Sequence, residues 1–321
     1  MILNTAIETM NRTEMQALQS QRMQKTVERC YKKVSFYQHQ MDALNVKYTD
    51  IKTINDINRL PFTTAHDLSA NYPFGLVTMP ISGVARFEQT PDLCKAAGFT
   101  AQDLAWQKEM IARSLIACDI TAASVLLELT NPFPGNASLS LRQTAEILGI
   151  TVIASQNTNA TSSLKTIEDF GVTTIFSSPD NLFAFADFLQ KQNVEIQDLP
   201  LKSLLCEANL CHNELRCQLQ QIFKIPVYTL YGRPDIASLG IAGDCYHQDG
   251  LHINEDHFYP EIIDPDTGEV LEDNQPGELV LTTISREATP LIRYRTQQIA
   301  VLTRESCICG RTSPRITFVS L

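Results

Sequence analysis

Residues 172–192, "VTTIFSSPDNLFAFADFLQKQ", pair a short apolar run with a helix-type pattern. The first part is rich in β-branched and aromatic residues and predicts a buried strand, whereas the second spaces its apolar residues along one helix face. The same alternation extends from about residue 100 to residue 232. Strands joined by single helices are crossover units, so the sequence predicts an α/β fold with a mainly parallel sheet and flanking helices.

The segments on either side of this region have different patterns. Residues 9–45 contain no glycine or proline and are rich in helix-forming side chains, which predicts one long helix or two. After residue 232, strand-like segments follow one another with little helix between them, and "DPDTGE" at 264–269 is a turn sequence. We therefore expect an N-terminal helical and α/β region, residues 1–232, and a C-terminal β subdomain, residues 233–321.

The composition is that of a globular protein. The chain has 321 residues, of which 44% are apolar and 19% charged, and its formal net charge is −10. An acidic chain has little attraction for nucleic acid or anionic membranes, so a small-molecule or protein partner is expected. The sequence shows no signal-peptide pattern at its start and no apolar run of membrane-spanning length, which favours the cytoplasm.

The nine cysteines fall into two groups. Six lie singly within apolar or helical patterns and are interpreted as free thiols: Cys30, Cys94, Cys118, Cys206, Cys211 and Cys217. The other three, Cys245, Cys307 and Cys309, lie among Gly, His and Asp residues. These three are candidate metal ligands.

A fourth ligand is available close to Cys245. His252 follows it in "DCYHQDGLH" at the start of the β subdomain, and Cys307 and Cys309 lie at its end. Three thiolates and one imidazole form a closed tetrahedral zinc site of the structural kind. His247 is the alternative to His252, and free thiols without a metal are the alternative to the whole site.

Two long motifs carry a resemblance to a known family. Residues 249–296, "DGLHINEDHFYPEIIDPDTGEVLEDNQPGELVLTTISREATPLIRYRT", and the following "CICGRTSPRI" at 307–316 closely resemble the phenylacetate–coenzyme A ligases, a branch of the AMP-forming, adenylate-forming enzymes. "LPFTTAHDLSANYPFGL" at 60–76 is also similar to that family. The resemblance implies the large N-terminal domain of such an enzyme, with an aryl or acyl carboxylate, Mg-ATP and coenzyme A as ligands.

The phosphate-binding position departs from the family pattern. Where members have a loop like "SSGTTGKP", this chain has "RFEQTPDLCKAAGFT" at 86–100. The segment has no glycine-rich run to bring backbone N–H groups to a phosphate. Glu88 and Asp92 would face the anion with like charge, and we expect no turn around Lys95. The sequence therefore predicts that no phosphate loop forms here.

The nucleotide-binding positions also depart. Tyr231, Gly232 and Asp235 stand where the family has Tyr-Gly-Leu-Ser-Glu, so we interpret them as a vestigial nucleotide site. The ribose-binding Asp of "RYRTGD" is replaced by Gln298. The Glu of a Gly-Ala-Glu motif near the adenine appears as Asn209. Several lost contacts to one ligand weigh against ATP and magnesium as cofactors.

Two further positions bear on activity. The hinge and the lid domain with its adenylation Lys are expected after "RTSPRI", where only "TFVSL" follows, and residues 127–136, with Phe133, fall where the family shapes its aryl pocket. We therefore predict a non-catalytic or catalytically impaired homologue that acts as a binding or partner protein. The alternatives are a ligase with residual activity or a lid supplied by another chain, and a decaying gene product without a selected role.

Overall fold

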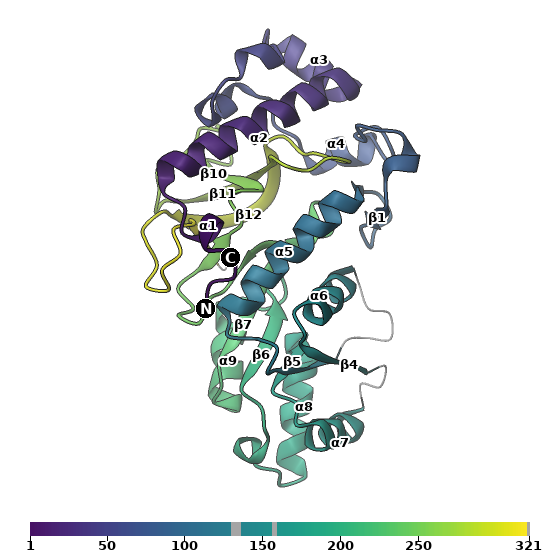
Figure 1. Cartoon of the computed structure of the whole chain (residues 1–321), viewed down its shortest axis with the longest axis vertical. Coiled ribbons are helices and arrows are strands. Elements are labelled where there is room, and N and C mark those ends of the chain that lie inside the picture. The colour runs from purple at the N-terminus through teal and green to yellow at the C-terminus, as the bar shows by residue number, and fades with distance from the viewer. Residues whose placement is uncertain (130–135, 156–158, 320–321) are drawn as a thin grey trace.

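A computed structural model describes residues 1–129, 136–155 and 159–319 (Figure 1). The expected pocket residue Phe133 lies outside these described residues. Among the described helices, none is long and apolar enough to cross a membrane.

The N-terminal region is helical, as expected. Two helices form rather than one, because Val34 between them adopts extended backbone angles (φ −123°, ψ 106°). Thr64 caps a later helix, since its side chain accepts a hydrogen bond from the Asp67 N–H. The elements are α1 (Thr5–Glu8), α2 (Arg12–Lys33), α3 (Ser35–Ala43), η1 (Tyr48–Asp50), η2 (Ile54–Arg59), α4 (Ala65–Ala70) and η3 (Ile81–Gly83).

The middle of the chain forms the predicted parallel sheet. Its strands run in the order β4-β3-β5-β6-β7. They are β3 (Val125–Leu129), β4 (Thr151–Ser155), β5 (Thr174–Ser177), β6 (Ser203–Glu207) and β7 (Val227–Arg233). Their helices are α5 (Ala101–Ala117), α6 (Asn136–Ile147), α7 (Ala160–Phe170), α8 (Pro179–Lys191) and α9 (Asn213–Phe223), with η4 (Ile196–Asp198) after α8.

Helices cover both faces of this parallel sheet. Leu126 of β3 packs with residues of α5 and α6, whereas its neighbour Leu127 packs with residues of α7, α8 and α9. Successive residues of a strand point to opposite faces, so the two helix groups lie on opposite sides. The continuous apolar runs read from the sequence are thus strands buried on both faces.

The C-terminal strands extend the same sheet in antiparallel fashion. The described strands join in the order β7-β8-β9-β13-β12-β11-β10, and the whole sheet has 11 strands. They are β8 (Ala237–Gly243), β9 (Leu251–Ile253), β10 (Phe258–Ile263), β11 (Pro276–Thr283), β12 (Tyr294–Thr303) and β13 (Arg315–Phe318). Helices α2 and α3 pack on this part, where Met23 and Tyr37 share a core with Leu281 and Tyr294.

The arrangement of β13 matters for the candidate metal ligands. This strand lies between β12 and β9, and Arg315 pairs with His252. The loop before β13 is therefore held against β9, although the two segments are about sixty residues apart in sequence. We did not predict β8 or β13, because β8 is rich in small residues and glycine and β13 is short, and such patterns carry little strand signal. The boundary at residue 232 stays a prediction, since β7 and β8 pair across it.

The segment at the phosphate-loop position forms a hairpin. Strand β1 (Arg86–Gln89) pairs with β2 (Ala96–Phe99). The expectation of no turn around Lys95 is wrong, because the Thr90 N–H donates to the Lys95 carbonyl (3.0 Å) and the Lys95 N–H donates to Thr90 Oγ1 (3.2 Å). A Thr-Pro-Asp segment favours such a reversal without any glycine.

Candidate functional site

The four expected metal ligands come together at the antiparallel end of the sheet. Cys245 follows β8, His252 lies in β9, and Cys307 and Cys309 lie in the loop between β12 and β13. Their ligand atoms all lie within 4.8 Å of one another. Cys245 Sγ is 3.9 Å from Cys307 Sγ, and Cys309 Sγ is 3.4 Å from His252 Nε2. The side chains of three separate segments thus converge on one point.

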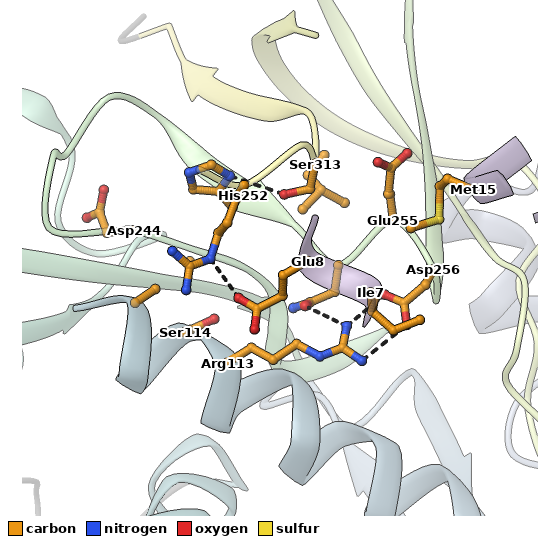
Figure 2. Close-up of a pocket in the computed structure, with 15 residues that line it drawn as sticks. Ile7, Glu8, Met15, Arg113, Ser114, Asp244, His252, Glu255, Asp256 and Ser313 are labelled. Carbon is orange, nitrogen blue, oxygen red and sulfur yellow. Dashed lines mark hydrogen bonds and ion pairs between the residues drawn. The ribbon is translucent and has the colours of Figure 1, made fainter. Parts of the chain in front are cut away.

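These distances fit a tetrahedral zinc ion. With Zn–S near 2.3 Å and Zn–N near 2.0 Å, tetrahedral angles place two sulfurs about 3.8 Å apart and a sulfur and a nitrogen about 3.5 Å apart. His252 Nδ1 lies 3.1 Å from Ser313 Oγ, which leaves Nε2 for a metal (Figure 2). The alternative ligand His247 is exposed and packs on the Tyr246 ring instead. Zinc binding itself stays a prediction.

The thiols of this cluster are electrostatically unequal. A hydrogen bond from Cys245 lowers the pKa of Cys309, and His252 and the backbone N–H of Arg311 lower it further against the effect of burial. The same hydrogen bond and burial raise the pKa of Cys245. One thiolate is therefore favoured before any metal arrives, and the thiolate is the form that binds metals.

Tyr231, one of the expected nucleotide-site residues, forms its contacts within the protein. Its ring is fully buried, and its hydroxyl donates to Gln298 Oε1 at 2.6 Å. The Phe318 ring packs against it, with the ring centroids 4.8 Å apart. Beside it, Gly232 is required by close packing, because an added Cβ would lie 2.1 Å from the Ser238 carbonyl oxygen.

Asp235 is held by two neighbours. Arg233 donates to it in a bidentate manner, with Nε 2.9 Å from Oδ1 and Nη2 2.8 Å from Oδ2, and the Tyr294 hydroxyl donates at 2.5 Å. Burial and the nearby Asp235 carboxylate raise the pKa of Tyr294, which keeps the hydroxyl a donor. Asp235 is itself 5% exposed. Its oxygens are thus directed to protein donors.

The same network includes the positions of the lost motifs. Gln298 Nε2 donates to Asn209 Oδ1 at 3.2 Å, and Asn209 donates to the Gly232 carbonyl. Arg233 Nη1 donates to Gln298 Oε1 at 3.2 Å. The structure therefore brings together the residues that the sequence assigned to one site. It adds Arg233 and Tyr294, which lie within the motifs but were given no role there, and Phe318, which no motif indicated.

Glu88, at the phosphate-loop position, faces the interior. Its side chain is fully buried and accepts hydrogen bonds from the Ser238 N–H (3.2 Å) and hydroxyl (2.5 Å), with Arg86 Nη1 at 3.3 Å. The expectation that it would face a bound anion is wrong, because β1 directs it toward β8. Asp92 lies in the turn, where a hydrogen bond from Thr90 and others from the turn lower its pKa to about 2.

Sequence comparison places the chain among curated ligases. It is 33% identical over 320 residues to a phenylacetate-coenzyme A ligase of Thermus thermophilus, an alignment that covers 98% of this chain and 72% of that protein. It is 31% identical over 325 residues to the Escherichia coli phenylacetate-coenzyme A ligase, covering 99% and 74%. No protein-family model matches the chain.

Structure comparison supports the same fold. A 2-hydroxyisobutyryl-CoA ligase in complex with 2-HIB-AMP superposes with a TM-score of 0.86 at 19% identity, over 97% of this chain and 68% of that one. A long-chain-fatty-acid-CoA ligase from Archaeoglobus fulgidus superposes with a TM-score of 0.57 at 14% identity, over 74% and 51%. The predicted α/β architecture is therefore confirmed as that of adenylate-forming CoA ligases. Together with the curated relatives, this shows that the chain belongs to the phenylacetate–coenzyme A ligase family.

Proposed function

We propose that this chain is a non-catalytic or catalytically impaired member of its family that acts as a binding or partner protein. The observation that carries the proposal is the closed network of Arg233, Asp235, Tyr294 and Gln298. It joins side chains at positions where the family resemblance places groups that contact ATP and magnesium. A nucleotide would have to displace these internal hydrogen bonds before it could form its own.

The cost of that displacement favours the proposal. Hydrogen bonds to charged groups contribute about 1.5–3 kcal/mol each. Asp235 accepts three of them, two from Arg233 and one from Tyr294. At the phosphate position the chain forms the β1–β2 hairpin in place of a glycine-rich loop, and Glu88 is bonded to Ser238 inside the protein. The contacts missing at both positions are contacts to the same ligand.

A structural zinc site is the second part of the proposal. Its support is the set of four protein ligands, Cys245, His252, Cys307 and Cys309, whose atoms lie within 4.8 Å of one another. Four protein ligands complete a tetrahedral shell and leave no position for a catalytic water. Zinc would join β9 to the loop before β13, and its contribution would be to stability.

A ligase with residual activity is the second candidate. It is favoured by Tyr231 and Asp235, which keep an aromatic ring and a carboxylate at the matching positions. In this case Arg233 would release Asp235 when Mg-ATP binds, and an aryl carboxylate would be adenylated. A lid supplied by a separate protein belongs to the same alternative.

A thermal-shift titration with Mg-ATP separates the two candidates. A ligand at 100 times its dissociation constant stabilises the folded state by about 2.7 kcal/mol. We expect no shift for the wild-type chain and no pyrophosphate release when phenylacetate is added. A clear shift with pyrophosphate release would overturn the non-catalytic proposal.

A matched variant sharpens this experiment. Arg233→Leu removes the bidentate partner of Asp235, and Gln298→Asp restores a carboxylate at the ribose position. If the internal network is what excludes nucleotide, the double variant should bind Mg-ATP more tightly than the wild type. Asp187→Asn, at an exposed ion pair with Lys191, is the control and should bind as the wild type does.

A further inference from the structure

The metal cluster lies next to the N-terminal segment of the chain. Arg311, two residues after Cys309, is 3% exposed and donates from Nε to Glu8 Oε2 at 2.7 Å and from Nη2 to the Met1 carbonyl at 2.6 Å. The loop that carries Cys307 and Cys309 therefore also contacts the N-terminal segment, through the Arg311 guanidinium.

Thr312 forms a second connection between the same segments. Its N–H donates to the Glu8 carbonyl at 3.0 Å, and its hydroxyl donates to the Met10 carbonyl at 2.8 Å. Helix α1 depends on such contacts, because its four residues are too few to be stable alone. The loop of residues 310–313 thus holds Met1–Met10 from its backbone as well as from a side chain.

Glu8 is the hydrogen-bond acceptor in the N-terminal segment. It is 6% exposed, and Oε1 accepts hydrogen bonds from the Leu3 N–H (2.8 Å) and the Asn4 N–H (2.7 Å) while Oε2 accepts from Arg311. Figure 2 shows Glu8 in a small polar cavity that His252 and Ser313 also line. One short loop thus contacts His252 through Ser313 and Glu8 through Arg311 and Thr312.

The positive charge of Arg311 also bears on the net charge of the metal cluster. A zinc ion with three thiolates and one neutral imidazole carries one net negative charge, and burial makes an uncompensated charge costly. The buried Arg311 guanidinium is two residues from Cys309 in the chain and donates to Glu8. It places a positive charge in the loop that carries Cys307 and Cys309.

We propose that the metal cluster holds the N-terminal segment, Met1–Met10, against the loop 307–313, and we call this arrangement the clasp. Metal binding sets the shape of the loop 307–313, and Arg311 and Thr312 then hold Met1–Met10 in place. Arg311 is a positioning residue in this scheme, because it connects the loop 307–313 to the N-terminal segment and does not ligate the metal. Loss of the metal releases the N-terminal segment before the rest of the fold. The inference rests on the proposed zinc site.

Hydrogen exchange followed by mass spectrometry tests the clasp on the full chain. The protein is loaded with Zn²⁺, and its peptides are compared before and after treatment with a chelator. We expect exchange of the amides in residues 3–10 to rise by about tenfold or more, as in local unfolding, while peptides of β11 and β12 change little. Metal content is measured on the same samples.

Variants separate the clasp from the metal site. Arg311→Met should retain zinc but show the fast N-terminal exchange of the metal-free protein, and Arg311→Lys should lie between the two. Arg59→Met, an exposed arginine in η2, is the control and should behave as the wild type. If Arg311→Met does not fold, Thr312→Val tests the same connection.

The outcomes are distinguishable. Protein that holds no zinc removes the metal site and, with it, the clasp. Protein that loses its zinc to the chelator and keeps slow exchange in residues 3–10 overturns the clasp alone. Unchanged exchange in zinc-loaded Arg311→Met also overturns it.

Discussion

Replacing Asp235 by Asn tests whether this carboxylate now has a structural role. The substitution keeps the size of the side chain and removes its charge. Asp235 accepts two hydrogen bonds from Arg233 and one from Tyr294, and it is 5% exposed. An amide can still accept from one donor, but its NH₂ group would face the guanidinium. The buried network would be left with an unpaired positive charge.

The expected loss follows from these contacts. Removing one partner of a buried ion pair costs about 3–5 kcal/mol, because the other charge stays buried. The Arg233 side chain is 20% exposed, so solvent screens part of this effect. We therefore expect Asp235→Asn to lower the free energy of unfolding by about 2–3 kcal/mol.

Urea unfolding measures this loss, and a double-mutant cycle assigns it. Arg233→Leu alone should destabilise the protein, whereas Arg233→Leu combined with Asp235→Asn should cost about 1–2 kcal/mol less than the sum of the two single changes. Asp187→Asn is the control, because its ion pair with Lys191 is exposed and should contribute less than about 1 kcal/mol.

Two results would refute the reasoning. A loss below about 0.5 kcal/mol in Asp235→Asn is typical of a surface substitution and would mean that the network contributes little. Additive effects in the cycle would mean that Arg233 and Asp235 do not interact in solution. Either result would mean that the internal contacts do not prevent Asp235 from binding magnesium.

Three further predictions concern other parts of the chain. Gln297 has a left-handed backbone (φ 59°), so Gln297→Gly should raise the free energy of unfolding by about 0.5–1 kcal/mol in urea; an unchanged midpoint would contradict this. Burial alone would raise the pKa of Asp256, but His257 and Arg113 hold it below its usual range. The contribution of the ionised Asp256 to the free energy of unfolding is therefore present above about pH 4 and lost as the pH falls. In unfolding curves measured from about pH 5 to pH 2, Asp256→Asn should make the free energy of unfolding less dependent on pH. Cys307→Ser should lower the thermal midpoint by about 5 °C or more and make it insensitive to a chelator, whereas a chelator-sensitive variant would argue against Cys307 as a ligand.

Much of the parallel half of the fold could be predicted from local pattern. The segment 172–192 contains a strand and a helix with clear boundaries, and Ser178 caps that helix by accepting a hydrogen bond from the Asn181 N–H. Gly171 ends the preceding helix in a left-handed conformation (φ 61°), which glycine adopts readily at a helix C-terminus. These features depend on residues that are close in the chain, which is why they can be predicted from the sequence.

The antiparallel half was less predictable because its order depends on distant pairing. Strand β13 inserts between β12 and β9, and nothing local in "RITF" indicates that place. The candidate metal ligands are an exception, since Cys and His spacing has a chemical meaning that does not require knowledge of the sheet. The pairing of Arg315 with His252 then explains how they meet.

The expected nucleotide site shows what motif comparison leaves out. Sequence alone identified missing groups at the phosphate and ribose positions, but it did not show what replaces their interactions. In the structure, Arg233 donates to Asp235, and the buried Glu88 accepts a hydrogen bond from Ser238. A polar residue that is buried needs partners within the protein, because unsatisfied polar groups are costly. The substitutions are therefore coupled, and restoring any one motif residue alone would break an internal contact without completing a nucleotide site.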